Sequence, residues 1–307
     1  MEKLIRLLTD EDYPHLEAMD TGMKDDYVQR VFPRLVRGNN RLYGLFLDGQ
    51  LVSIGGYSIY AKHHAMLGRL RSDRRFRGSD LATELMSYVM QEAFRSEDIQ
   101  WVGANTQEDN AAARRVLEKL KLKKLTALHG ALTKDTSALV AGAKTWNEVH
   151  DLQRKKEWVH QAYVENSNLF PYECYYPFPA SWELFNNEDL QKWSFYENDK
   201  QTRFLITKTD QKKHYYLHAV YPWSDITNQA GLWETISKDY EKVLKQTKSE
   251  AYIWMDLTKE EAQTLPPNHS FQLPSPWILH GMNKREWNQT GACHSPKFVE
   301  PQSPTAP

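Results

Sequence analysis

The chain has 307 residues, and its 39 lysines and arginines stand against 40 aspartates and glutamates, which leaves a net charge of −1 at pH 7. This length favours two domains of about 150 residues, each large enough to bury its own core. The balance of charge argues against a chain-wide attraction to nucleic acid or to a membrane surface, so any attraction for anions is expected to be local.

The two cysteines, Cys174 and Cys293, are far apart and match no metal-binding or redox spacing. This usage is typical of a reducing compartment and predicts neither a disulfide scaffold nor a metal site. The N-terminal apolar run is too short for a signal peptide, and no later run approaches the length of a membrane span. We therefore expect a cytoplasmic protein.

The first half predicts a mixed α+β fold (α/β) with a central sheet flanked by helices. A short strand at 3–8 precedes helices at 10–19 and 22–37, and two strands at 41–48 and 51–61 should pair as a hairpin. There follow, in order, a strand at 65–72, a helix at 80–95, a strand at 99–106, a helix at 109–121 and a strand at 123–132.

The second half repeats this order more loosely, which predicts a degenerate internal copy of the same fold. Its expected elements are strands at 193–199, 203–209 and 215–221, a helix at 230–247, a strand at 250–257, a helix at 258–264 and a strand at 276–287. Nine of the ten tryptophans lie from Trp146 to Trp287, so we place a connector near 135–150. The predicted domains are 1–140 and 141–290, followed by a disordered tail at 291–307.

The segment Arg69–Met86, "RLRSDRRFRGSDLATELM", puts five arginines within nine residues at the start of the helix at 80–95. A loop that leaves a strand and opens a helix presents unpaired N–H groups and the positive end of the helix dipole. Gly78 can adopt a positive φ, which lets consecutive amides point into one concavity. The pattern predicts a phosphate-binding turn, and the alternative is a solvated arginine-rich edge.

"RSDRRFRGSDLATELM" resembles the pyrophosphate loop of the general N-acetyltransferase (GNAT) superfamily, Arg/Gln-x-x-Gly-x-Gly/Ala after a strand, with Arg77 in the first position and Ala82 in the last. The segment "NTQEDNAAARRVLEKLKLKKL" is similar to the second signature of the family, and the matching positions are Asn110, Ala113, Val116, Leu117 and Lys119. The resemblance covers residues 3–134. It implies two tandem GNAT-like domains when it is joined to the internal repeat.

The resemblance also implies a set of cofactor contacts for acetyl-CoA. Main-chain groups of Leu70, Arg71 and Ser72 would hydrogen-bond the pantetheine arm, and Asn110 would contact the arm beside the second helix. Arg74 and Arg75 would reach the adenosine phosphate. The amides that would hold the pyrophosphate belong to Arg77, Gly78, Ser79, Asp80, Leu81 and Ala82.

Three positions depart from the family pattern. Asp80 replaces the inner glycine and puts a carboxylate where a pyrophosphate should approach, unless its side chain caps the helix. Leu117 replaces the tyrosine that serves as general acid, and Lys121 replaces the following glycine. Acid catalysis would therefore come from elsewhere.

The family glutamate that serves as a general base has no clear counterpart on the strand at 65–72. The polar candidates nearby are Tyr57, Tyr60, His64 and Asp73, with the adjacent His63, and each of these types also occurs as a purely structural group. The resemblance implies an acetyl-CoA-dependent N-acetyltransferase that acts on a small-molecule or peptide amine by direct attack in a ternary complex. The alternatives are a noncatalytic acyl-CoA sensor or partner-binding protein, and a nucleic-acid binder, which the charge balance disfavours.

The second half lacks an Arg-x-x-Gly loop, so we expect it to carry no second cofactor site. Its aromatic stretch "NLFPYECYYPFPASWELF" (168–185) is interpreted first as core packing and second as the lining of a pocket for an apolar or cationic ligand. Cys174 lies in a Pro-rich turn with no histidine paired to it. The second half would shape the acceptor site or an interface.

Overall fold

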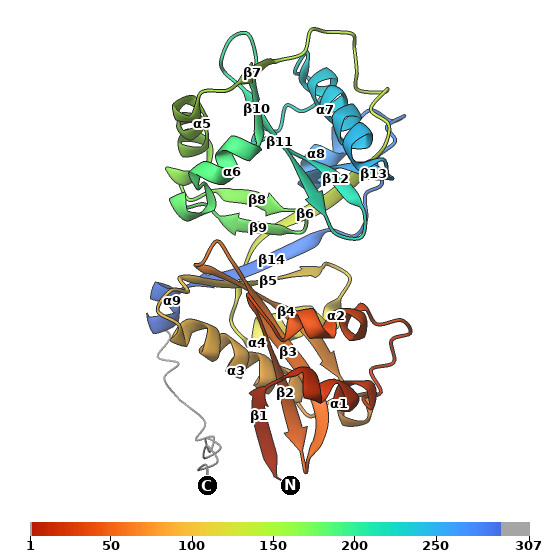
Figure 1. Ribbon diagram of the computed structural model, residues 1–307, viewed down its shortest axis with the longest axis vertical. Coiled ribbons are helices and arrows are strands. Elements are labelled where there is room, and N and C mark those ends of the chain that lie inside the picture. The colour runs from red at the N-terminus through yellow and green to blue at the C-terminus, as the bar shows by residue number, and fades with distance from the viewer. Residues whose placement is uncertain (1, 290–307) are drawn as a thin grey trace. The chain divides into compact units, whose positions relative to one another are not determined.

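The computed structural model describes residues 2–289, which divide into two compact units (Figure 1). Of the described residues, unit 1 takes 2–105, 110–125 and 280–289, and unit 2 takes 106–109 and 126–279. The segment 135–150, where composition predicts a connector, therefore lies inside unit 2. The tail that we expect to be disordered, 291–307, is outside the described residues.

Unit 1 is built on a mixed sheet in which four antiparallel strands are followed by a parallel one. The strand order is β1-β2-β3-β4-β5-β14, and β5 pairs parallel with β4. The strands are β1 (Lys3–Leu7), β2 (Asn40–Leu47), β3 (Gln50–Tyr60), β4 (His64–Ser72), β5 (Trp101–Gln107) and β14 (Trp277–Asn283).

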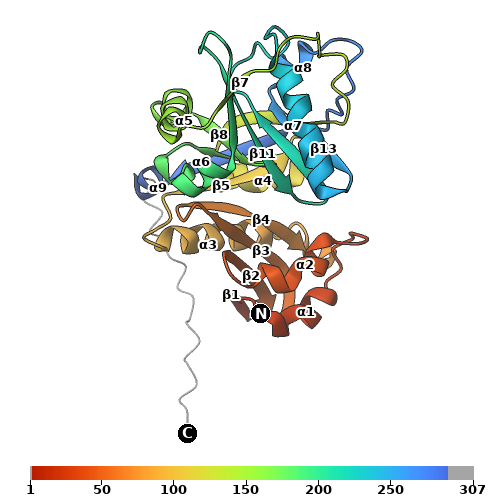
Figure 2. The same cartoon turned by 45° about the horizontal axis from the view of Figure 1, so that its top comes forward.

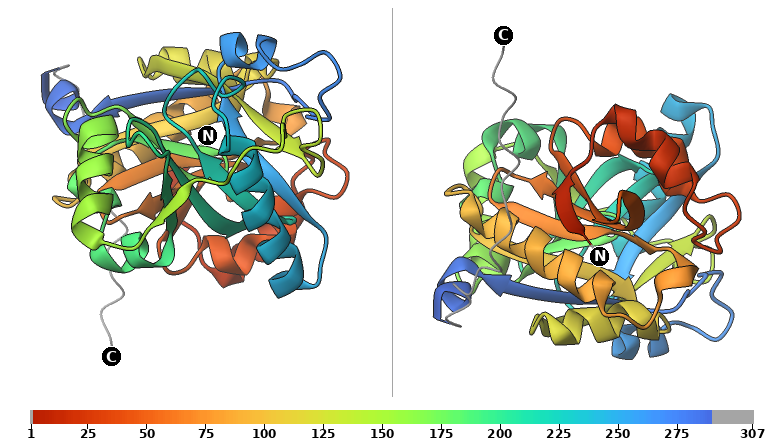
Figure 3. Two further views of the ribbon diagram at one scale, coloured as in Figure 1. Left: turned by 90° about the horizontal axis from the view of Figure 1, so that it is seen from above. Right: turned by 90° about the horizontal axis from the view of Figure 1, so that it is seen from below.

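Helices cover both faces of this sheet (Figure 3). The helices are α1 (Tyr13–Glu17), α2 (Tyr27–Leu35), α3 (Leu81–Arg95), α4 (Ala111–Lys119) and α9 (Lys284–Gln289), with short 3₁₀ turns at Asp10–Asp12 and Arg74–Phe76. On α3, Leu85 and Val89 are fully buried in one core cluster, because their spacing of four residues keeps them on one helix face. On α2, Val28 and Phe32 are fully buried in a second cluster on the opposite face.

Unit 2 has a strand order that matches that of unit 1, β7-β10-β11-β12-β13-β6, with one parallel pair, β12 and β13. The strands of this sheet are β6 (Lys123–Thr133), β7 (Asn147–Val149), β10 (Ser194–Glu197), β11 (Phe204–Gln211), β12 (Tyr215–Val220) and β13 (Ala251–Leu257). A helix joins β12 to β13, as α3 joins β4 to β5. Both units thus have the topology of a mixed sheet with a helical crossover.

The long helix α7 (Leu232–Thr247) packs on β12 and β13 of unit 2 (Figure 2). Its apolar residues Leu232, Ile236 and Val243 lie in one core cluster. The remaining elements of unit 2 are α5 (Leu152–Val159) with a π-helical turn at His160–Val164, the hairpin β8 (Leu169–Glu173) and β9 (Tyr176–Pro179), a 3₁₀ turn at Trp182–Leu184, α6 (Asn187–Lys192) and α8 (Lys259–Gln263).

The predicted α+β class with a flanked central sheet is confirmed, while two predicted elements are corrected. The helix expected at 22–37 begins at Tyr27, because Asp26 caps it by accepting the amide of Val28 at 3.0 Å. The turn predicted around Cys174 is present and forms the tip of the β8–β9 hairpin. The strand expected to reach residue 287 ends at Asn283.

A reciprocal cap explains why β14 stops there. The Asn283 side chain accepts the amide of Glu286 at 2.8 Å, and the Glu286 carboxylate accepts the amide of Asn283 at 3.0 Å. These two bonds satisfy amides at the start of α9 and favour a helix over a continued strand. Met282 and Trp287 from this C-terminal segment pack on the core of unit 1, and the Trp287 ring stacks on Phe94 at 5.1 Å.

Met282→Ala should destabilise unit 1 even though residue 282 is far along the chain from the rest of that core. The Met282 side chain is 4% exposed, and truncation of a buried methionine typically costs about 2–5 kcal/mol. Chemical unfolding of wild type and Met282→Ala would measure the loss in the free energy of unfolding. The control Met23→Ala, at a methionine that is 53% exposed, should change the free energy of unfolding by no more than about 0.5 kcal/mol.

Candidate functional site

The candidate site of unit 1 begins where β4 and β5 part. The two strands pair over four positions, from His64 opposite Trp101 to Leu67 opposite Ala104. Beyond Leu67, β4 continues to Ser72 and keeps its pairing with β3, but it no longer pairs with β5. One edge of β4 from Gly68 to Ser72 is therefore open to an extended ligand that hydrogen-bonds main-chain groups.

A β-bulge lies in this open part of β4. Arg69 and Leu70 stand together opposite Gly55 of β3, and Arg69 has a positive φ of 59°. A bulge of this kind bends the strand and re-aims its side chains. The Arg69 side chain forms no hydrogen bond or ion pair with any other described residue.

The loop after β4 leads into the first turn of α3. Gly78 has a φ of 86°, and a Cβ placed there would meet nothing within 4 Å. The amides of Leu81, Ala82 and Thr83 donate to no acceptor among the described residues. The loop from Arg77 to Asp80 is exposed, so this turn has the open amides that bind anions.

Asp80 does not cap α3, which corrects the structural alternative considered for it. It stands in the cap position with a positive φ of 56°, and its side chain accepts no helix amide. Its carboxylate instead pairs with Lys119 of α4, at the surface. The carboxylate is thus turned away from the amides that a phosphate would use.

Three of the five clustered arginines are paired with aspartates. Arg71 forms two bonds to Asp26, at 2.6 and 2.8 Å, and both side chains are largely buried. Arg74 forms two bonds to Asp20, at 2.9 and 3.1 Å, at the surface. Arg75 is paired with Asp73. These pairs tie the loop before α2 to the loop after β4.

Arg69 and Arg77 have no carboxylate partner among the described residues. Arg77 donates to the carbonyl oxygen of Thr21 at 3.0 Å and is otherwise exposed. The positive charge that remains for a ligand is therefore smaller than the count of arginines indicates. It lies on Arg69, within the open segment of β4, and on Arg77, in the loop that follows.

Asp73 is a fully buried carboxylate that accepts four hydrogen bonds. Three come from Arg75, through its amide and guanidinium at 2.5–2.9 Å, and one comes from the amide of Asp20 at 3.2 Å. The Arg75 guanidinium is the main reason why the pKa of Asp73 lies well below its usual range. A carboxylate so stabilised in its charged form is a weak proton acceptor.

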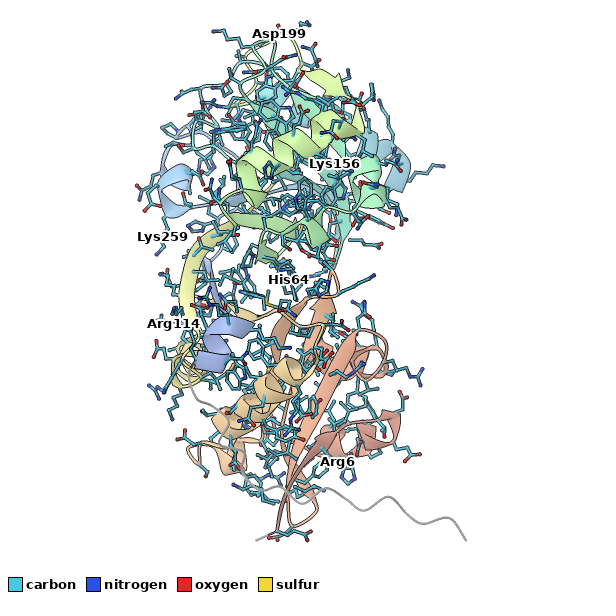
Figure 4. The ribbon with its side chains drawn as sticks, turned by 90° about the vertical axis from the view of Figure 1, so that its left-hand side faces the viewer. Arg6, His64, Arg114, Lys156, Asp199 and Lys259 are labelled. Atoms are coloured by element: carbon cyan, nitrogen blue, oxygen red, sulfur yellow. The ribbon has the colours of Figure 1, made fainter. Side chains whose placement is uncertain are left out.

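The other proposed catalytic groups are not gathered at the open segment. Tyr60 and His64 face each other across the β3–β4 turn, at the end of β4 opposite to the loop (Figure 4). Eight residue steps along β4 separate His64 from Ser72, which is about 26 Å in an extended strand. Tyr57 is 7% exposed, stacks on Tyr43, and has a pKa raised by burial.

The second signature segment forms α4 and its ends. Asn110 caps the helix by accepting the amide of Ala113 at 3.1 Å. Leu117 lies in the core of unit 1, 6% exposed, so the position of the family's acid is here a packing position. Lys121 has a φ of 58°, and the backbone thus keeps the left-handed conformation that a glycine would favour.

The corresponding helix start in unit 2 is covered by the chain itself. Glu234 in the first turn of α7 accepts the amides of Ala141 and Ala143 at 2.9 and 2.8 Å. A Cβ on Gly231, the cap residue, would lie 2.2 Å from the carbonyl oxygen of Lys144. Residues 141–146 therefore occupy the place where an anion would meet this helix.

Sequence reasoning missed Asp20 and Asp26, the partners of Arg74 and Arg71. The acidic segment "DTGMKDD" at 20–26 carries the signal, but the helix predicted at 22–37 includes most of that segment. Among the described residues, no helix has the length and apolar character of a membrane span, and no three His, Cys, Asp or Glu side chains are grouped to hold a metal ion.

Comparison with known proteins finds a family model that matches the first part of the chain. Residues 2–121 match the model of the acetyltransferase (GNAT) family. The match covers most of unit 1 and less than half of the chain. A comparison with curated proteins found no match.

Solved structures resemble the chain over most of its length. A GCN5-related N-acetyltransferase from Sphaerobacter thermophilus aligns with a TM-score of 0.57 and 13% identity, over 92% of this chain and 96% of that one. A Thermoplasma acidophilum protein assigned to the acetyltransferases aligns with a TM-score of 0.51 and 15% identity, over 91% and 99%. The shared fold therefore extends over both units.

Lys121→Gly should stabilise unit 1. A non-glycine residue in the left-handed region costs about 1–2 kcal/mol, and the larger entropy of glycine in the unfolded chain offsets part of that gain. We expect a net gain of about 0.5–1 kcal/mol in chemical unfolding. The matched control is Lys124→Gly, two residues into β6 with no positive φ, which should destabilise; a loss in both variants would contradict the explanation.

Asp73→Asn should lower the free energy of unfolding at pH 7 by about 1–3 kcal/mol, because buried donors lose a charged acceptor. The depressed pKa means that the native carboxylate stabilises the fold above the unfolded pKa of about 3.9, and that this contribution is lost as the pH falls below that value. The difference between wild type and variant should therefore shrink between pH 4 and pH 2. A difference that stays constant with pH in urea unfolding would contradict this.

Proposed function

We propose that this protein is an N-acetyltransferase that uses acetyl-CoA and transfers the acetyl group to a primary amine. The observation that carries the proposal is the open edge of β4, which leads directly into a helix start with unoccupied amides. An extended pantetheine arm needs such an edge, and a pyrophosphate needs such a helix start. Main-chain groups of Leu70 to Ser72 would bind the arm.

The loop would hold the pyrophosphate through the amides from Arg77 to Ala82. Gly78 leaves room for the phosphate oxygens, and the pairing of Asp80 with Lys119 keeps the carboxylate from competing for the same amides. Arg69 and Arg77 would supply the positive charge, since Arg74 and Arg75 are already paired. Asn110, at the start of α4, would contact the arm.

In a direct transfer, the neutral amine attacks the thioester carbonyl in a ternary complex. A C–N bond forms, the C–S bond breaks, and the proton lost by the amine balances the charge on the leaving thiolate. Backbone N–H groups of the open β4 segment would stabilise the oxyanion. Asp73 is disfavoured as the base by its low pKa, and Leu117 supplies no acid, so we assign the proton transfers to solvent water within the site.

Unit 2 would be a degenerate second copy of the fold without its own acyl-CoA site. Its matching strand order supports the repeat, and the covering of Gly231 by residues 141–146 supports the lack of a second site. The domains would then correspond roughly to residues 1–140 and 141–290, with strand β14 contributed to the first. We expect the protein to act in the cytoplasm.

A second candidate function is a noncatalytic acyl-CoA-binding protein, which the buried Leu117 favours. Both candidates predict acetyl-CoA binding, and they differ in the release of thiol. A thiol-reactive dye in the presence of acetyl-CoA and a panel of primary amines would separate them. Release of thiol that depends on the added amine supports the acetyltransferase over the noncatalytic binding protein.

The first test is calorimetric titration of acetyl-CoA into wild type, Gly78→Glu and Asp80→Gly. We expect wild type to bind, Gly78→Glu to lose binding by about 100-fold or more because it adds a charge and bulk at the phosphate position, and Asp80→Gly to bind at least as tightly. His150→Gln, at a side chain of unit 2 that is 81% exposed, serves as a control outside the loop. No binding by wild type and Asp80→Gly alike would refute the proposal.

A further inference from the structure

Unit 2 contains a buried histidine whose ring is oriented by a carboxylate. Nε2 of His218 on β12 is 2.9 Å from Oδ2 of Asp256 on β13, and the same oxygen accepts the indole N–H of Trp254 at 3.1 Å. The side chain of His218 is fully buried, and that of Asp256 is 7% exposed. This pair has no part in the proposed acetyl-CoA site.

The hydrogen bond to Asp256 sets the tautomer of His218. A carboxylate only accepts, so the proton in this bond belongs to Nε2. Burial lowers the pKa of His218, against the opposing effect of Asp256, which leaves a neutral ring with a lone pair on Nδ1. No donor among the described residues reaches that buried atom, and a buried acceptor without a donor is costly.

The pair lies where the parallel strands of unit 2 part. β12 and β13 pair over four positions, and His218 opposite Trp254 is the last of them. Asp256 follows two residues later on the same face of β13. The position along the strands matches that of the open segment in unit 1. Tyr175 of the β8–β9 hairpin covers this face, with its ring 4.3 Å from that of Trp254.

The charged groups around the pair include one buried cation, Lys208, which interacts with Asp256 electrostatically without forming an ion pair with it. Lys208 stands opposite His218 on β11, but its ammonium donates to the carbonyl oxygens of Pro171 and Tyr172 in the hairpin. Asp210 accepts the amide of Cys174 and lies 3.4 Å from Lys212. No lysine or arginine of the described chain forms an ion pair with Asp256.

A buried carboxylate, an imidazole lone pair and aromatic rings together suit one class of ligand. A small organic ammonium ion donates N–H bonds, carries the compensating charge and is attracted by ring faces. We propose that unit 2 binds a small primary amine, as its ammonium ion, through His218 Nδ1 and the charge of Asp256. The identification of this amine with the acetyl acceptor rests on the proposed function; the site itself does not.

The test uses the full chain labelled with ¹⁵N, and it observes the ring nitrogens of histidine by NMR. The probes are n-propylammonium, propionate and 1-propanol, which are similar in size. We expect His218 to be the Nε2–H tautomer, and its Nδ1 resonance to shift saturably with n-propylammonium and not with propionate. A Nδ1 resonance already typical of a hydrogen-bonded nitrogen and unchanged by the amine would mean a buried water only, and would overturn the proposal.

Substitutions at His218 and Asp256 test whether n-propylammonium binds at this pair. Asp256→Asn and His218→Phe should each weaken n-propylammonium binding by about tenfold or more, since each removes a hydrogen-bonding or charged partner of the ligand. The control is His150→Gln, a histidine of the same unit whose side chain is 81% exposed, which should bind as wild type does. Equal binding by all four proteins would refute the site, and the wild-type spectra decide the matter if a variant fails to fold.

Acetyl-CoA titrations of the same proteins separate this inference from the proposed function. We expect His218→Phe and Asp256→Asn to keep the acetyl-CoA affinity of wild type within about twofold. Amine binding without acetyl-CoA binding would uphold the site and refute the acetyltransferase. Acetyl-CoA binding without a response of His218 to the amine would refute the amine site and leave the acetyl-CoA site of unit 1 standing.

Discussion

The separation of β4 from β5 after four paired positions is the constraint on which the candidate site depends. A parallel pair that continued to Ser72 would use the main-chain groups of β4 internally, and no extended ligand could reach them. The bulge at Arg69 lies in the segment that is freed, and the loop that follows delivers the open turn of α3. Strand pairing, bulge and helix start thus form one continuous arrangement from residue 68 to residue 83.

Charge compensation determines what that arrangement can bind. Asp20, Asp26 and Asp73 neutralise three arginines and in doing so fasten the loop before α2 against the loop after β4. Exposed pairs such as Arg74 with Asp20 contribute little to stability, whereas the buried carboxylate of Asp73 requires its partners. The arginine cluster therefore has a structural role first, and only Arg69 and Arg77 lack a carboxylate partner among the described residues.

The two units share one strand order, but different groups lie at the point where their parallel strands separate. In unit 1 the parting strands lead to an open helix start, and in unit 2 the equivalent helix start is closed by residues 141–146, which bond to Glu234. The parting point of unit 2 instead holds the His218–Asp256 pair beneath an aromatic hairpin. A fold with a built-in gap between strands can thus present either main-chain groups or buried side chains at that gap.

The periodicity of apolar residues was enough to predict the strand and helix order of the first half and of residues 193–283, because the spacing of apolar residues reports which face of a strand or helix is buried. It did not predict β7, α5, the β8–β9 hairpin or α6. The motifs around Arg77 and Asn110 were enough to indicate the GNAT family. The sequence did not show that Asp80 turns to Lys119, that three arginines are paired, or that Met282 belongs to the first core. Those outcomes depend on which distant residues come together, and only the tertiary structure decides that. The same holds for His218 and Asp256, which are 38 residues apart and become a pair only because their strands are neighbours.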